Sequence, residues 1–192
     1  MIRQLPNFFT EPQMVALATL PDRSTVEGVR DRAILGTLCA TGVRASELCQ
    51  LLVRDVTPTL VFVRRGKGGT QRYVPLSSRC RAAIARYLTA HPARPDEPLF
   101  RRLEGGALDR RLLYKIVSAY CKRLRLKPGV HILRASCATR LLNRGLNLQL
   151  VRALLGHAEL ASTAIYLGVA TDQLVREYRQ AAEWAVDGGR SR

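Results

Sequence analysis

The chain has 192 residues, enough to bury one hydrophobic core and few for two. Its net charge of +16 and pI of about 10.8 predict a polyanionic partner, above all nucleic acid. The five cysteines form no CxxC pair and no zinc-ligand pattern with the three histidines, which favours reduced, buried thiols in a cytosolic protein. The sequence contains neither a signal-peptide pattern nor an apolar stretch that could span a membrane, so we expect no membrane partner.

Helical patterns dominate the first quarter of the chain. Thr10 and Gln13 have the spacing of a capping box, which predicts a helix that begins there. A second helix is expected through residues 29–38, and Gly42 is a typical residue to end it. A short helix is expected over 46–51.

The middle of the chain contains β-rich segments. Residues 59–64 and 71–75 flank Gly66-Lys67-Gly68-Gly69, a pattern that predicts a hairpin with Lys67 at its tip. Residues 53–56 are expected to add a third antiparallel strand.

Helical spacing returns after the hairpin. We expect helices over 77–89, 109–124, 132–143, 148–155 and 171–185, and a short one that carries Tyr166. The proline-rich stretch 91–98 is short enough for a loop within one domain. The predicted fold class is therefore α+β and mainly α, with a small three-stranded antiparallel sheet, in a single domain over 1–186 followed by a flexible tail over 187–192.

Two arginines are candidates for holding a phosphodiester. Negative charge builds on the non-bridging oxygens as phosphorus is attacked, and a pair of guanidiniums can clamp both oxygens. Arg44 precedes the expected helix at 46–51, and Arg134 lies on the expected helix at 132–143. In a chain this rich in arginine, the alternative for either residue alone is a solvated surface side chain.

Two of the three histidines, His131 and His157, are further candidates. His131 is one helical turn before Arg134, so both are expected on one face, where His131 can accept a proton or bind phosphate. His157 follows Gly156 at an expected helix end. The alternatives are a hydrogen-bonded structural role for His131 and a helix-dipole contact for His157.

Lys67 and Tyr166 complete the candidate set. Only four of the 31 basic residues are lysines, yet a lysine occupies the hairpin tip, and a lysine can release a proton that an arginine retains. Tyr166 is a candidate nucleophile. The alternatives are a simple phosphate contact for Lys67 and core packing for Tyr166, which lies in an apolar run.

The ordered set resembles a known family. Thr41-Gly42-Val43-Arg44-Ala45-Ser46-Glu47-Leu48, Gly66-Lys67-Gly68, His131-Ile132-Leu133-Arg134, Leu154-Leu155-Gly156-His157 and Tyr166 are similar to the catalytic domain of the tyrosine recombinases, which include phage integrases and Xer-like recombinases. The resemblance covers about residues 8 to 185. It implies that Tyr166 forms a 3′-phosphotyrosyl bond with no metal, ATP or other cofactor.

The same resemblance implies a role for each site residue. Arg44 and Arg134 would clamp the phosphate, and Lys67 would be the general acid. His131 would be a general base or phosphate ligand, and His157 a hydrogen-bond donor to the phosphate. The sequence departs from the family pattern at Ile132, where aspartate is common, and at Ala135-Ser136, where a His-Thr pair is common.

The resemblance also implies partners. Double-stranded DNA would be the substrate, and the last helix would dock on a neighbouring copy in a tetramer through residues such as Leu174, Tyr178 and Trp184, unless these pack on their own domain. In the family an all-helical core-binding domain of roughly a hundred residues usually precedes this domain, whereas here the first expected helix begins near residue 10. We therefore expect either a minimal recombinase or a separated catalytic fragment, which a separate core-binding or accessory protein could complement. Such a protein would act in the cytoplasm of a prokaryotic cell, encoded there or by its phage or mobile element.

We therefore expect a site-specific DNA recombinase or integrase. One alternative is a DNA-binding regulator derived from such an enzyme, which would bind DNA without cutting it. Another is a type IB topoisomerase-like enzyme, which would relax DNA without exchanging strands. A third is a basic helical protein whose motif matches are fortuitous, and the ordered spacing of the motifs argues against it.

Overall fold

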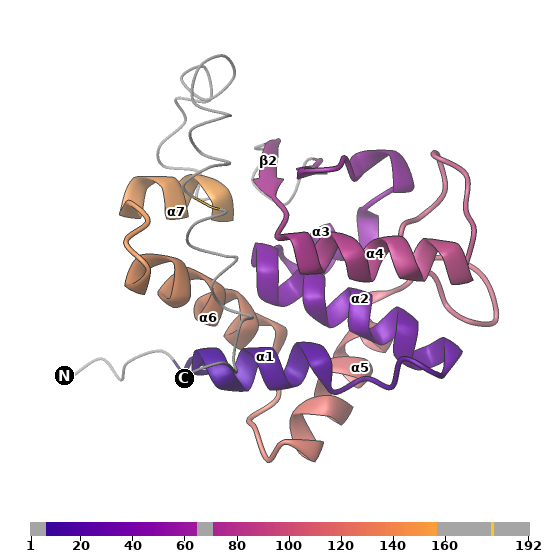
Figure 1. The fold of residues 1–192 in the computed structure, drawn as a ribbon, viewed down its shortest axis with the longest axis horizontal. Helices are drawn as coiled ribbons and strands as arrows, with labels where there is room; N and C mark the ends of the chain where they lie inside the picture. Colours follow the sequence, from indigo (N-terminus) through magenta and orange to yellow (C-terminus); the bar gives the residue numbers. More distant parts are fainter. Residues whose placement is uncertain (1–6, 65–70, 157–177, 179–192) are drawn as a thin grey trace, which may run out of the picture.

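The computed structural model describes residues 7–64, 71–156 and 178, and these are mainly helical (Figure 1). In chain order the elements are α1 (Glu11–Thr19), α2 (Val26–Thr41), α3 (Ala45–Gln50), the 3-10 turn η1 (Val53–Asp55), β1 (Leu60–Val63), β2 (Arg72–Pro75), α4 (Ser78–Ala90), α5 (Arg110–Arg123), α6 (Val130–Asn143) and α7 (Leu148–Leu155).

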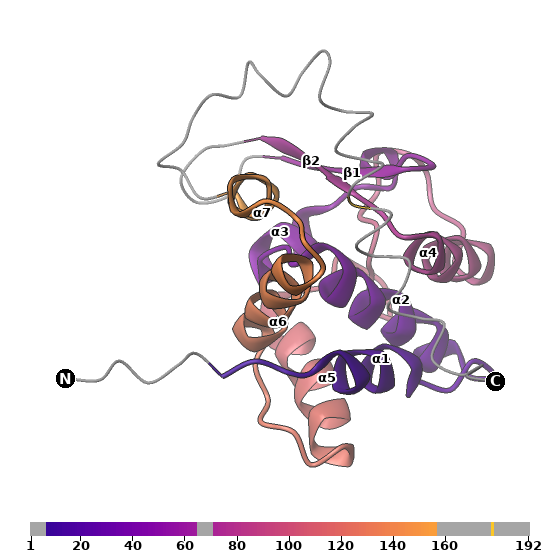
Figure 2. The same ribbon diagram turned by 60° about the vertical axis from the view of Figure 1, so that its left-hand side comes forward.

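Helix α2 forms the centre of the described fold. Figures 1 and 2 show α4 on one side of it and α6 on the other, with α1 packed across it. The consecutive residues Ala33, Ile34 and Leu35 are all completely buried, so most of the circumference of α2 is enclosed at this point, and the adjoining Arg32 and Gly36 are only partly exposed. The hydrophobic core is built around this helix, and the site described below lies at the end of it that is marked by Gly42.

The helix boundaries predicted from capping residues are confirmed. The Thr10 amide donates to Gln13 Oε1 at 2.9 Å at the start of α1. Gly42 ends α2 with φ 61°, a left-handed conformation that glycine adopts without steric cost. Gly156 ends α7 in the same way with φ 69°.

The predicted third strand is wrong. Within the described residues the sheet has two strands, β1 and β2, paired antiparallel with Val63 opposite Arg72. Residues Val53–Asp55 form a 3-10 turn, and Val56 makes an isolated bridge to Val61. The Asp55 carboxylate accepts the Leu52 amide at 2.8 Å, and this local bond favours a turn over an extended ladder.

Phe9 and Tyr178, which are far apart in the sequence, both bond to the core. The Phe9 amide donates to Ser136 Oγ on α6 at 2.7 Å. Tyr178 is completely buried and its hydroxyl donates to the Ala40 carbonyl on α2 at 2.7 Å. Tyr178 therefore packs on its own chain, whereas Leu174, Trp184, the remainder of the predicted last helix and the tail over 187–192 lie outside the described residues.

All five cysteines are free thiols, and four of them are buried, as predicted. Burial raises the pKa of Cys39 to about 12 and that of Cys80 to about 11, so these thiols stay protonated and unreactive near neutral pH. No helix in the described ranges is long and apolar enough to cross a membrane.

Candidate active site

Arg44 lies at the start of α3, directly after the turn that ends α2. Its backbone amide donates to Glu47 Oε2 at 2.8 Å, and its side-chain Nη1 donates to Glu47 Oε1 at 3.0 Å. Its Nη2 donates to the Gly156 carbonyl at the end of α7 at 3.2 Å. About a third of the side chain (34%) remains exposed, so the guanidinium is oriented by the protein and still accessible to a ligand.

Arg134 reaches the same place from α6. Its Nη1 donates to the Gly42 carbonyl at 2.8 Å, and its Nη2 donates to the Leu155 carbonyl. The two candidate arginines thus donate to consecutive carbonyls, of Leu155 and Gly156, and the fold brings their guanidiniums to the same place.

This crowding of positive charge changes the acidity of Arg134. Burial, followed by the charges of Arg44 and Arg72, lowers the pKa of Arg134 to about 10. The guanidinium stays charged at neutral pH, but its environment disfavours that charge. An anion placed between these groups would relieve the repulsion.

Glu47 and Arg72 complete the cluster, and neither has a role predicted from the sequence. Arg72 Nη1 and Nη2 donate to Glu47 Oε1 and Oε2 at 3.0 and 2.8 Å, a bidentate ion pair that is almost fully buried. Glu47 had a detectable signal, because an acid three residues after a helix-capping position is typical of a capping box. Arg72 had no local signal, since its partners lie 25 and 82 residues away in the sequence.

The Glu47 carboxylate is held ionised. Burial raises its pKa, but the hydrogen bonds and charge of Arg72 and the bonds from Arg44 outweigh burial and lower the pKa to about 2. One carboxylate therefore faces the guanidiniums of Arg44, Arg72 and Arg134, and the cluster retains an excess of positive charge. Such an arrangement is suited to binding an oxyanion and to stabilising negative charge that develops on it.

Residues 7–173 match the model of the Phage integrase family, which is most of the chain. The chain belongs to this family. The match includes every candidate site residue named from the sequence.

Curated phage integrase family relatives agree with this assignment. The chain is 37% identical over 183 residues to tyrosine recombinase XerC of Pelobacter propionicus, covering 93% of this chain and 61% of the relative. It is also 37% identical over 187 residues to tyrosine recombinase XerD of Chlamydia pneumoniae, covering 92% and 62%. The chain thus spans less than two thirds of the length of these relatives.

Solved structures of family members share the fold. XerA recombinase superposes with a TM-score of 0.72 at 27% identity, covering 100% of this chain and 67% of that one. The integrase of mycobacterium phage Brujita superposes with a TM-score of 0.75 at 20% identity, covering 100% and 62%, which shows similarity of fold. XerH bound to difH substrate superposes with a TM-score of 0.69 at 28% identity, covering 88% and 52%.

Of the other four candidate residues, His131 lies within the described part of the chain. His131 lies in the first turn of α6, one turn before Arg134 as predicted, and its side chain is exposed. A Cβ on Gly129 would lie 2.8 Å from the His131 ring, so glycine there leaves space for the imidazole. Lys67, His157 and Tyr166 lie outside the described residues. Lys67 belongs to the stretch that joins β1 to β2, and His157 follows Gly156 directly.

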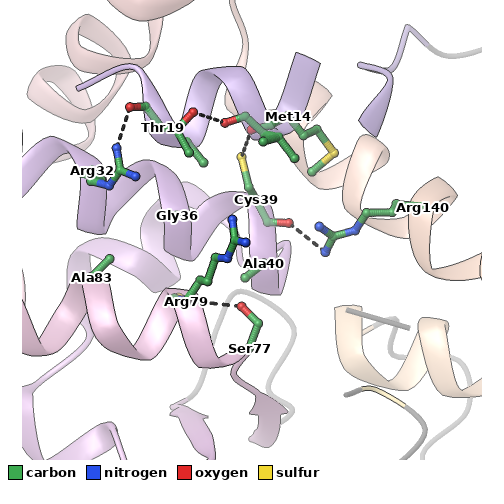
Figure 3. A pocket seen from close by; sticks show the side chains of 13 residues that line it. Met14, Thr19, Arg32, Gly36, Cys39, Ala40, Ser77, Arg79, Ala83 and Arg140 are labelled. Carbon is green, nitrogen blue, oxygen red and sulfur yellow. Dashed lines mark hydrogen bonds between the residues drawn. The ribbon is translucent and has the colours of Figure 1, made fainter. Parts of the chain in front are cut away.

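A separate hollow in this chain lies where α1, α2 and α4 meet, with Arg140 of α6 at its edge (Figure 3). Its lining includes Met14, Cys39 and Ala40 but none of the candidate site residues. In the part of the chain that the structure describes, no group of three or more His, Cys, Asp or Glu could hold a metal ion.

Proposed function

We propose that this chain is a site-specific DNA recombinase that cuts and rejoins DNA through Tyr166. The observation that carries the proposal is the convergence of Arg44 and Arg134 on the carbonyls of Gly156 and Leu155 at the C-terminal end of α7, immediately before His157. Their guanidiniums would clamp the non-bridging oxygens of a scissile phosphate, and the excess positive charge of the cluster would stabilise the transition state. The related recombinase XerH, whose structure was solved with its difH substrate in a pre-cleavage complex, supports DNA as the ligand.

In the proposed reaction the Tyr166 oxygen bonds to phosphorus while the bond from phosphorus to the 5′-oxygen breaks. Lys67 gives its proton to the leaving 5′-oxygen, and His131 accepts the phenolic proton or binds the phosphate. His157 donates a hydrogen bond to the phosphate. A 5′-hydroxyl from the partner duplex then attacks the phosphotyrosine and releases Tyr166, so the energy of the broken linkage is retained without ATP, metal or other cofactor.

We further propose that residues 1–186 act as one catalytic domain that assembles as a tetramer on DNA through the segment over 171–185. The Ala40 carbonyl, which accepts the Tyr178 hydroxyl, belongs to a residue that lines the hollow in Figure 3. In the tetramer, Tyr178 of a neighbouring copy would take the place that Tyr178 of the same chain occupies here. Sedimentation with and without DNA tests this: DNA-dependent tetramers support it, and monomers on saturated DNA contradict it.

Covalent capture tests the catalytic proposal in a prokaryotic host. The wild-type chain and Tyr166→Phe would be expressed with candidate DNA, the lysate denatured, and the DNA that remains attached to protein sequenced. We expect adducts at a recurrent site with the wild type and none with Tyr166→Phe, although both bind DNA. DNA binding without adducts in both would favour the regulator, and adducts with relaxation but no recombinant product would favour the topoisomerase-like enzyme.

A further inference from the structure

Arg72 joins three parts of the candidate site. It is the first residue of β2, and its guanidinium is almost fully buried, with 8% of the side chain exposed. Nη1 and Nη2 bind the two oxygens of Glu47 on α3, and Nε donates to the Leu154 carbonyl near the end of α7 at 2.6 Å. One side chain therefore connects the hairpin, the helix that begins after Arg44, and the helix end before His157.

Arg72 and Arg44 compete for the same carboxylate. Glu47 Oε1 accepts from Arg44 Nη1 and from Arg72 Nη1, each at 3.0 Å, and the Glu47 side chain is 1% exposed. A buried carboxylate must be paired, and an arginine fork is the partner that fits it best. Because Arg72 supplies that fork, Arg44 donates to Glu47 through only one side-chain nitrogen, Nη1. The remaining donors of its guanidinium can therefore bind a ligand.

We propose that Arg72 is a positioning residue for DNA cleavage, because it saturates Glu47 and thereby keeps Arg44 available to the phosphate. The inference rests on the proposed function. Without Arg72, the uncompensated Glu47 carboxylate would draw Arg44 into a bidentate pair and neutralise it. Arg44 would then turn away from the Gly156 carbonyl and from the place where the phosphate would bind.

The packing at Gly156 supports this role. A Cβ added to Gly156 would lie 2.8 Å from Arg72 Nη1 and 3.1 Å from Arg72 Cζ. The Arg72 guanidinium thus lies directly against the turn whose carbonyl accepts Arg44 Nη2. Loss of Arg72 would leave this turn without its support and Leu154 without its donor.

The hairpin offers a matched control at its other strand. Arg64 directly follows β1, and its Nε and Nη2 bind Asp55 Oδ1 at 2.9 and 2.6 Å. Like Arg72, it anchors the hairpin through an arginine fork on a buried carboxylate. Its partner is Asp55 in η1, whereas Glu47 keeps its pair with Arg72, so loss of Arg64 weakens the hairpin anchor without exposing the Glu47 charge to Arg44.

The test compares four full-length proteins: wild type, Arg72→Met, Arg64→Met, and Arg72→Met combined with Glu47→Gln. The readout is the single-turnover rate of covalent adduct formation on a DNA site captured by the wild type, together with DNA affinity. We expect Arg72→Met to slow the rate about 100-fold at nearly unchanged affinity, and Arg64→Met to slow it less than about threefold. Glu47→Gln removes the charge that captures Arg44, so the double variant should regain at least about tenfold of the lost rate.

Two results would overturn the proposal: equal slowing by Arg64→Met and Arg72→Met, or a double variant no faster than Arg72→Met. A merely structural role predicts the second result, since the double variant lacks both partners. If Arg72→Met does not fold, Arg72→Lys, which keeps the charge but not the fork, should slow the rate by about tenfold, and an unchanged rate would overturn the proposal.

A readout independent of chemistry separates this proposal from the proposed function. If the wild type forms no Tyr166-dependent adduct, the proposed function fails, and stabilisation by inorganic sulfate still reports whether Arg44 is available. We expect sulfate to raise the Tm of the wild type and of the double variant but not that of Arg72→Met. Equal sulfate stabilisation of wild type and Arg72→Met would refute the role given to Arg72.

Discussion

Arg44 and Glu47 are bonded twice, once through the Arg44 backbone amide and once through its guanidinium. The first bond caps α3, and the second orients a side chain that reaches the end of α7. The same carboxylate thus fixes the start of the helix and the direction of the candidate phosphate ligand. Changes in the charge of Glu47 should therefore be visible in both stability and anion binding.

Stability should depend on pH through Glu47. Its pKa of about 2 in the folded chain lies below the ordinary value of 4.5, so its ionised form stabilises the fold fully above about pH 4.5, and this is lost as the pH falls through about 2. The difference between these two pKa values corresponds to roughly 3 kcal/mol in the free energy of unfolding, and more than half of this contribution should be lost by about pH 3. Urea denaturation at several pH values should show that the free energy of unfolding of the wild type exceeds that of Glu47→Gln by less and less as the pH falls across this range. Parallel curves for the two proteins would exclude a special role for this carboxylate.

Substitution of Gly156 should be more damaging than substitution of a comparable glycine. Gly145 follows α6 with φ 84° and has open space around its missing Cβ, so Gly145→Ala should cost about 1 kcal/mol from backbone strain alone. Gly156→Ala adds a clash with Arg72, whose guanidinium is pinned by Glu47 and Leu154, and should cost roughly 2 to 3 kcal/mol. Free energies of unfolding from urea titrations compare the two. Equal losses in the free energy of unfolding would mean that the Arg72 side chain can move away from the new Cβ without loss of stability.

Inorganic sulfate should stabilise the wild-type chain. The lowered pKa of Arg134 reflects burial and the repulsion of neighbouring arginines, and a bound anion would offset that repulsion. At about ten times its Kd, sulfate should add roughly 1 to 2 kcal/mol to the free energy of unfolding. The effect should be lost in Arg44→Met and Arg134→Met and kept in Arg111→Met, which changes an exposed arginine on α5. A loss in all three variants would indicate a general charge effect in place of a site.

Local signals in the sequence predicted most of the fold. The boundaries at Thr10, Gly42 and Gly156 were readable because capping side chains and left-handed glycines act within a few residues. The third strand was predicted wrongly because the residues around 53–56 are β-prone, whereas the Asp55 carboxylate binds the Leu52 amide and closes a turn. Residue preference alone does not reveal that competition.

The candidate site was predicted in part. Arg44 and Arg134 were identified through their motifs, and the structure brings them together at α7. Arg72 was missed because its role depends on contacts with Glu47 and Leu154, which are distant in sequence and meet only after the hairpin packs on α3 and α7. Pairing of this kind leaves no periodic or local pattern in a single sequence.

The central claim is that Tyr166 forms the covalent bond to DNA, and mass spectrometry of the captured adduct tests it most directly. Trypsin should release residues 153–176 as one peptide, in which Tyr166 is the single tyrosine. After nuclease digestion, we expect a nucleotide 3′-phosphate on Tyr166 of this peptide. An unmodified peptide from DNA-bearing protein, or a nucleotide on another tyrosine such as Tyr120, would contradict the account.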